Sequence, residues 1–315
     1  MAMPVSLDRP IVGIDVAKKE LVIYHRDSER LEAIPNDKPS IKKWLKTVPH
    51  GTMIAIEATN TFHVLFADLA YEKGCVIYMV DGYRLSRYRE GVNVRAKTDA
   101  KDAWLLARYL HNEFKELKPW VPACPLYRDL QSLFRRRAAL VQAYTGLKQS
   151  WSNEPHLKSA FKAHIKSMER LVALVEAQIK KALHEAGLTH QLKRCMKIEG
   201  IGFLNAARLV TAFMRGDFKG ADAFIAFLGM DLRVSKSGQK DGRRSLTKRG
   251  DPEVRRLLYV AAMAARKTSA WKPFYEAQCK RGFSSTEALV MLARKLARVA
   301  FALLKNQSEY QTKMV

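Results

Sequence analysis

Short apolar segments alternate with amphipathic segments along the first third of the chain. Residues 10–24 read as two strands joined by a turn at residues 17–19, and further apolar runs lie at 52–57 and 75–80. Apolar positions at helical spacing predict helices over 39–47, 61–73 and 99–111, with a loop before the last of them. Strands that alternate with helices predict an α/β domain with a mixed or parallel sheet.

The pattern changes to long helices after three prolines at positions 119, 122 and 125. Residues 126–150 and 157–186 have apolar positions at helical spacing, which predicts an antiparallel helical hairpin or coiled-coil arm. A plain helical spacer and a dimerisation arm fit this pattern equally well. Helices are also predicted near 221–228, 252–268 and 284–305 in a mainly α C-terminal part. The predicted domains are therefore 1–120, 121–190 and 191–315.

The charge of the chain points to a polyanionic partner. The 315 residues carry a formal net charge of +24, and residues 193–315 hold 25 Lys and Arg against 10 Asp and Glu. Such an excess of positive charge favours binding to nucleic acid. No apolar run reaches the length of a membrane span, and the four cysteines have neither metal-ligand spacing nor the pattern of a disulfide framework. We expect a cytoplasmic protein with no membrane partner.

Two aspartates at the start of the helix predicted over 99–111 have two readings. Thr98 can cap this helix, and Asp99 and Asp102 in its first turn complement the helix dipole. Alternatively, carboxylates at positions i and i+3 share one face of a helix and can hold a divalent cation together. This segment alone favours capping.

Two further carboxylates change that balance. Asp15 lies within the apolar strand at 11–16, and Glu57 ends the apolar strand at 53–57. A buried carboxylate is unfavourable unless it is paired or binds a metal. Asp15, Glu57, Asp99 and Asp102 could together surround two Mg²⁺ (or Mn²⁺) ions, the arrangement that stabilises both oxygens of an in-line phosphodiester displacement. The four residues are therefore the candidate catalytic and metal-binding groups.

The C-terminal part holds two candidate nucleic-acid-binding segments. Gly200 and Gly202 lie in a turn between two helical runs, which is typical either of a phosphate-binding helix-hairpin-helix or of an ordinary turn between helices. Residues 232–250 are rich in Ser, Gly, Lys and Arg. Their candidate phosphate contacts are the basic residues Lys236, Lys240, Arg243, Arg244, Lys248 and Arg249. From its residues alone this segment reads best as a solvated basic loop without chemistry, and it does not single out one of its serines.

Several motifs in this order resemble one known family. They are Gly13-Ile-Asp15-Val-Ala-Lys18, Ile56-Glu57-Ala-Thr59 and Lys97-Thr98-Asp99-Ala-Lys-Asp102, followed by Ile198-Glu-Gly-Ile-Gly202, Ser237-Gly238 and Lys248-Arg-Gly250. They resemble the DEDD and C-terminal motifs of the IS110 family of insertion-sequence transposases, which includes the Piv/MooV-type DNA invertases. The resemblance covers nearly the whole chain.

The resemblance implies a fold and an activity. It implies an N-terminal domain like the resolvase RuvC (ribonuclease H-like), a coiled-coil arm, and a C-terminal transposase domain whose serine nucleophile acts with the DEDD metal site. The match to Ser-Gly selects Ser237 over Ser235. It further implies donor and target DNA as partners, an element-encoded bridge or seeker RNA as guide, and a homodimer or homotetramer in which the serine acts in cis or in trans.

Three functions follow from these observations. The leading hypothesis is a DNA transposase or recombinase that cuts and rejoins strands through a transient Ser–DNA bond. A RuvC-like endonuclease that hydrolyses branched DNA with two metals, without serine catalysis, is the first alternative. A non-catalytic nucleic-acid-binding protein is the second. The four acids argue against the last, because they would repel phosphate unless a metal neutralised them.

Overall fold

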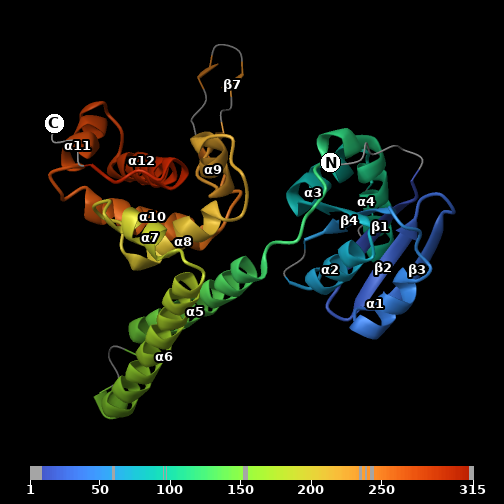
Figure 1. The fold of residues 1–315 in the computed structure, drawn as a ribbon, viewed down its shortest axis with the longest axis horizontal. Coiled ribbons are helices and arrows are strands. Elements are labelled where there is room, and N and C mark those ends of the chain that lie inside the picture. Colours follow the sequence, from blue (N-terminus) through green and yellow to red (C-terminus); the bar gives the residue numbers. More distant parts are fainter. Residues whose placement is uncertain are drawn as a thin grey trace. The chain divides into compact units, whose positions relative to one another are not determined.

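The computed structural model describes residues 9–58, 61–94, 96, 98–151, 155–233, 236–237, 240–241 and 245–311, with only the backbone described at 236–237 and 240–241. The chain divides into two compact units, residues 1–122 and 123–315 (Figure 1). Within the described residues, no helix is both long and apolar enough to span a membrane.

A five-stranded mixed sheet forms the centre of the first unit. Its strands are β1 (Ile11–Val16), β2 (Glu20–His25), β3 (Arg30–Pro35), β4 (Met53–Glu57) and β5 (Val76–Val80). The strand order is β3-β2-β1-β4-β5, in which β1, β2 and β3 are antiparallel neighbours and β4 and β5 run parallel to β1. The central strands β1 and β4 are buried along nearly their whole length, because helices cover both faces of the sheet.

Four helices and a short 3-10 turn complete this unit. They are α1 (Lys38–Leu45), α2 (Val64–Glu72), α3 (Gly82–Gly91), α4 (Asp99–Glu113) and η1 (Phe114–Glu116). One face of the sheet packs with α1 and α2, through Ile14, Ile56, Trp44 and Phe66 among others. The other face packs with α3 and α4. Alternate residues of each strand therefore enter separate cores, and Gly13, Asp15 and Glu57 belong to the α4 side.

The first unit confirms most of the predicted elements and corrects one. The strands at 10–24, 52–57 and 75–80 and the helices at 39–47, 61–73 and 99–111 are present within two or three residues of their predicted ends. The predicted loop before residue 99 is wrong, because it contains α3. This helix buries only Leu85, so its apolar periodicity is weak, and it begins where Asp81 accepts hydrogen bonds from the backbone N–H groups of Tyr83 and Arg84. The edge strand β3 was not predicted.

The second unit begins with a helical hairpin. It consists of α5 (Pro125–Ser150), η2 (Pro155–Leu157) and α6 (Lys158–Glu185). Figure 1 shows α5 and α6 side by side. Ion pairs join them, with 2.6 Å between Arg137 Nε and Glu176 Oε1 and 2.7 Å between Lys148 Nζ and Glu169 Oε1. The predicted helical hairpin is confirmed.

A bundle of shorter helices forms the rest of this unit. Its helices are α7 (Thr189–Met196), α8 (Phe203–Phe213), α9 (Ala221–Phe227), α10 (Pro252–Ala265), α11 (Lys272–Lys280) and α12 (Ser285–Asn306). Leu130 and Phe134 of α5 and Ile179 and Leu183 of α6 enter the same hydrophobic core as these helices. The α5–α6 hairpin is therefore anchored at one end by the core of the second unit. The predicted mainly α character is confirmed, and α11 was not predicted.

The described residues of the basic segment between α9 and α10 include four two-residue strands. They are β6 (Leu232–Arg233), β7 (Lys236–Ser237), β8 (Lys240–Asp241) and β9 (Ser245–Leu246). β6 pairs with β9 and β7 with β8, both antiparallel. The structure thus contains short ladders where the sequence predicted an irregular loop, because a segment with so few apolar positions has no detectable period of two.

Candidate functional site

A glycine in β1 allows α4 to lie directly on the sheet. A Cβ atom at Gly13 would lie 2.5 Å from the backbone nitrogen of Ala107 and closer still to the carbonyl oxygen of Ala103. Only glycine permits this approach of two backbones. Because Asp15 is two residues beyond Gly13 on the same face of β1, the close packing places Asp15 beside the first turn of α4. That turn contains Asp99 and Asp102.

The register of the sheet adds Glu57 to this position. β1 and β4 pair in parallel, with Gly13 opposite Ala55 and Ile14 opposite Ile56. One step further along the same ladder brings Asp15 opposite Glu57, at the carboxyl ends of the two central strands. Both side chains are half-buried and lie on the α4 face of the sheet. Four carboxylates from β1, β4 and α4 thus converge at one edge of the first unit.

The charges of the other three acids act on Asp15. Burial, followed by repulsion from Asp99, Asp102 and Glu57, raises the pKa of Asp15 from 3.8 to about 6. A backbone hydrogen bond at Val16 opposes this rise. A carboxyl group that ionises next to three other carboxylates is in an environment that strongly attracts cations.

An arginine from α3 interacts with one of these acids. Arg89 Nη2 makes a close ion pair with Asp102 Oδ1, and Asp102 is only 6% exposed. The Nε of Arg89 is buried and has no hydrogen-bond partner among the described residues. The sequence did not identify Arg89, since its segment was assigned to a loop. The helix that carries Arg89 could have been predicted from Asp81, which is a typical N-cap residue, and from the spacing of Leu85 and Tyr88.

The start of α3 also lies against the site. A Cβ atom at Gly82 would be 2.5 Å from Oε1 of Glu57, so the absence of a side chain at this position leaves room for the carboxylate. Gly82 is the first residue of α3, where backbone N–H groups point outward. The first turn of α3 thus adds to the favourable environment of the Glu57 carboxylate.

The donor set suits a hard divalent cation. All four acids offer oxygen ligands, which Mg²⁺ and Mn²⁺ prefer. In the described residues, no three acidic, histidine or cysteine side chains are grouped closely enough to hold an ion as they stand. The guanidinium of Arg89 also occupies an oxygen of Asp102 that a cation would need. The residues fit a metal by their chemistry and by the repulsion at Asp15, and their side chains would have to move closer together to hold one.

Capping and charge clustering coexist at α4. Thr98 is the N-cap and accepts a hydrogen bond of 3.3 Å from the backbone nitrogen of Lys101. Asp99 and Asp102 both lie in the first turn. The capping role expected of Thr98 is confirmed, and it does not account for the buried position of Asp102 or for its proximity to Asp15.

The two glycines of the turn between α7 and α8 differ in their surroundings. Gly200 has φ = +88°, and a Cβ atom there would lie 2.5 Å from the carbonyl oxygen of Ala261 in α10. Its conformation and its packing both require glycine. Gly202 is the N-cap of α8 and has open space around its Cα. Phosphate binding at this turn stays a prediction, and Gly202 is the residue that leaves room for it.

The base of the basic segment is firmly held. Gly250 packs closely on Gly229, because a Cβ atom at Gly250 would lie 2.6 Å from the backbone nitrogen of Gly229. Arg255 Nη1 donates a hydrogen bond of 2.7 Å to the carbonyl oxygen of Gly250. The Thr247 hydroxyl is hydrogen-bonded to Asp231. Lys248 and Arg249 are exposed beside this base. Ser237 and Lys236 form β7, opposite Lys240 in β8. Three other predicted positions, Ser235, Arg243 and Arg244, lie outside the described residues.

Comparison with known proteins identifies the family. Residues 12–162 match a family described as "Transposase" (DEDD_Tnp_IS110), and residues 192–276 match the "Transposase IS116/IS110/IS902 family". The chain is 22% identical to the pilin gene-inverting protein of Moraxella bovis, over 98% of this chain and 99% of that protein. It is 24% identical to a probable family 20 transposase of Pseudomonas aeruginosa, over 95% of this chain and 98% of that protein. The chain belongs to the IS110 family of transposases and is a DNA recombinase.

Proposed function

We propose that the chain cuts and rejoins DNA strands with divalent-metal assistance at Asp15, Glu57, Asp99 and Asp102. The convergence of the other three acids on Asp15, which raises its pKa to about 6, is the observation that carries this proposal. When bound, Mg²⁺ or Mn²⁺ would supply charge stabilisation for the phosphoryl transition state. The protein's own groups hold the carboxylates in place, with Gly13 setting the distance between β1 and α4 and Gly82 leaving room for Glu57.

Arg89 fits a role as temporary counterion in this proposal. In the metal-free site its guanidinium neutralises Asp102 and lowers the repulsion among the four acids. When a cation takes over this function, Arg89 becomes available to a phosphate oxygen, for which guanidinium is well suited. Without metal it would position Asp102, and with metal it would contact the substrate phosphate.

We further propose that Ser237 is the nucleophile. Its hydroxyl oxygen would bond to the scissile phosphorus while the DNA 3′-oxygen leaves and a nearby base removes the hydroxyl proton. The match of Ser237-Gly238 to the family motif supports this choice over Ser235. The basic residues of the segment supply positive charge for the phosphate, and the serine acts either in cis or from a second protomer.

We also propose a RuvC-like fold for the first unit, a guide RNA, and assembly into a dimer or tetramer. The mixed sheet with acids at the ends of its central strands supports a RuvC-like (ribonuclease H-like) first unit. The net charge of +24 supports a ribonucleoprotein with an element-encoded guide RNA. Strand exchange needs two DNA partners, which supports a dimer or tetramer joined partly through α5 and α6.

Two variants and one control variant test the chemistry. DNA from the ends of the mobile element that encodes the chain serves as substrate, with Mg²⁺ and any copurified RNA retained. Asp15→Asn should abolish strand cleavage while the fold persists. Ser237→Ala should abolish both cleavage and the denaturation-resistant protein–DNA adduct, whereas Ser235→Ala should keep most activity. Full cleavage by Asp15→Asn would refute the carboxylate assignment. Cleavage by Ser237→Ala with loss in Asp15→Asn would instead favour the two-metal endonuclease.

A further inference from the structure

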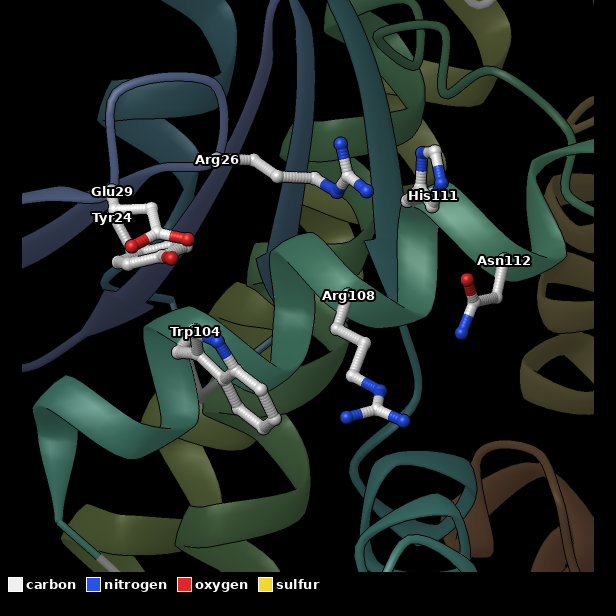
Figure 2. A pocket seen from close by; sticks show the side chains of 7 residues that line it. All are labelled: Tyr24, Arg26, Glu29, Trp104, Arg108, His111 and Asn112. Carbon is white, nitrogen blue, oxygen red and sulfur yellow. The ribbon is translucent and has the colours of Figure 1, made fainter.

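A polar hollow lies beside α4, apart from the four carboxylates. Its volume is about 460 Å³, within the roughly 300–1,000 Å³ of typical ligand sites. Figure 2 shows its seven lining residues, which come from α4 and from the turn that follows β2 together with the end of that strand. They are Tyr24, Arg26, Glu29, Trp104, Arg108, His111 and Asn112. None belongs to the proposed catalytic group.

The contribution of α4 is a stripe along one side of the helix. Lys101, Trp104, Arg108 and His111 follow one another at intervals of three and four residues, so they share a face. At about 100° per residue, this face is turned away from Asp102. The first turn of α4 thus directs acids towards the sheet, whereas another face of the same helix carries cations and an aromatic ring. Arg108 is about 9 Å along the axis from Asp102, at 1.5 Å per residue.

Cations surround the tryptophan ring. The guanidinium of Arg108 lies 5.3 Å, and the ammonium of Lys101 5.6 Å, from the Trp104 ring. The ring itself is half-buried, and Arg108 and Lys101 are exposed. An aromatic face flanked by cations is what proteins use to bind single-stranded nucleic acid, because the ring stacks on a base while the cations contact the adjoining phosphates.

The two ends of the hollow differ in charge. At one end Glu29 faces Tyr24, and burial followed by the Glu29 charge raises the pKa of the Tyr24 hydroxyl. At the other end the Arg26 side chain extends towards His111 (Figure 2), and burial followed by the Arg26 charge lowers the pKa of His111. The acidic end can accept a hydrogen bond from an N–H group of a base, and the basic end can receive a phosphate.

We propose that this hollow binds an unpaired nucleotide of a single DNA or RNA strand, with its base against Trp104 and its flanking phosphates at Arg26 and Arg108. An unpaired base has a free face for the ring, whereas bases in a duplex are already stacked and paired. The hollow is therefore a site for a separated strand rather than for duplex. That this strand runs on to the carboxylates rests on the proposed function. Binding at the hollow does not.

Photo-cross-linking locates the contact within the full-length protein. Short oligothymidine and oligouridine, each carrying one thio-substituted base, serve as DNA and RNA probes, and a duplex with the same substitution serves as the comparison. Mass spectrometry should find cross-links at Trp104 or Tyr24 with one or both single strands and few with duplex. The strand that cross-links more efficiently identifies the source. Saturating binding of both single strands without any cross-link to these residues would overturn the proposal, and so would preferential cross-linking by the duplex.

Affinity measurements separate stacking from charge. Trp104→Ala should weaken single-strand binding at least about 5-fold without changing the slope of log K against log salt. Trp104→Phe should restore most of the loss. Arg108→Ala should lower the steepness of that slope by about 0.7, the value for one phosphate on a single strand. Lys115→Ala, an exposed cation of η1 outside the hollow, is the matched control and should change neither quantity.

The outcomes also distinguish this inference from the proposed function. If Asp15→Asn loses cleavage but keeps the Trp104 cross-link, both stand. If Asp15→Asn still cuts DNA while the cross-link is present, the carboxylate proposal fails and the nucleotide site stands. Unchanged affinity and salt slope in Trp104→Ala and Arg108→Ala, with cleavage still dependent on Asp15, would remove the nucleotide site alone. Melting temperatures of the variants identify any that fail to fold, and if Trp104→Ala is among them, cross-linking of the wild-type protein and the salt slope of Arg108→Ala decide.

Discussion

Asp15→Asn should make the metal-free protein more stable, although it removes a residue of the proposed active site. Asp15 ionises with a pKa of about 6 instead of 3.8 because it is buried and repelled by Asp99, Asp102 and Glu57. A shift of this size corresponds to about 3 kcal/mol between the protonated and ionised forms, and solvent screening leaves about 1–3 kcal/mol to be measured. Asparagine is uncharged and avoids this repulsion.

The sign of the pH dependence follows from the raised pKa. The stabilising contribution of protonated Asp15 is complete below its unfolded pKa of 3.8 and is lost as the pH rises through about 6. At about pH 8 the wild-type protein bears the full repulsion, so Asp15→Asn should be the more stable protein by about 1–3 kcal/mol. Near pH 4 the difference should become small, because most of the wild-type side chain is then protonated.

Urea unfolding with metal removed by chelation measures this difference, and Glu72→Gln provides the control. Glu72 is exposed on α2, so its neutralisation should change the free energy of unfolding little. Mg²⁺ should stabilise the wild-type protein and leave Asp15→Asn unchanged, because only the former keeps the full set of acids. If Asp15→Asn is no more stable than the wild type at about pH 8 without metal, the repulsion that we infer at Asp15 does not exist.

Three further predictions follow from contacts in the structure. In thermal unfolding, Gly13→Ala should destabilise the first unit by about 2–3 kcal/mol, because the added methyl group meets the backbone of α4. The control is Gly146→Ala in α5, where the glycine has open space around it, and this change should stabilise the protein by about 0.5–1 kcal/mol. Burial alone would raise the pKa of Glu32, but the hydrogen bonds of this side chain lower the pKa from 4.5 to about 2. The ionised Glu32 therefore stabilises the fold above pH 4.5, and this stabilisation is lost as the pH falls towards 2. Glu32→Gln should flatten acid unfolding in that range, and an unchanged curve would contradict this reasoning. Arg89→Ala should increase the rise in melting temperature caused by Mg²⁺, since Asp102 loses its counterion; an equal or smaller rise than in the wild type would count against the counterion role of Arg89.

The sequence predicted the elements whose apolar period is strong and missed those stabilised by other means. β3 is an edge strand that alternates between exposed and half-buried residues, so no continuous apolar run marks it. It forms because its backbone pairs along the whole of β2. α3 and α11 bury only one residue each, Leu85 and Gln278, so few buried apolar positions mark them.

The sequence led to the four acids as candidates, but it did not reveal the packing and the ion pair that surround them. A carboxylate within an apolar strand is unusual enough to be noticed, which led to Asp15 and Glu57. The approach of α4 to Gly13, however, depends on tertiary packing that no local pattern reveals. The pairing of Arg89 with Asp102 depends in turn on the position of α3. Long-range contacts of this kind set the charge balance of the site, and the sequence does not display them.

Calorimetric titration of the DNA-bound protein with Mn²⁺ tests the central claim most directly. The claim is that Asp15, Glu57, Asp99 and Asp102 form one cation site at the end of the central strands. We predict saturable binding of roughly two Mn²⁺ per chain in the wild type and its loss in Asp15→Asn, with Glu72→Gln unchanged. Binding of the same number of ions with the same affinity in Asp15→Asn, or no saturable binding in the wild type, would contradict the account.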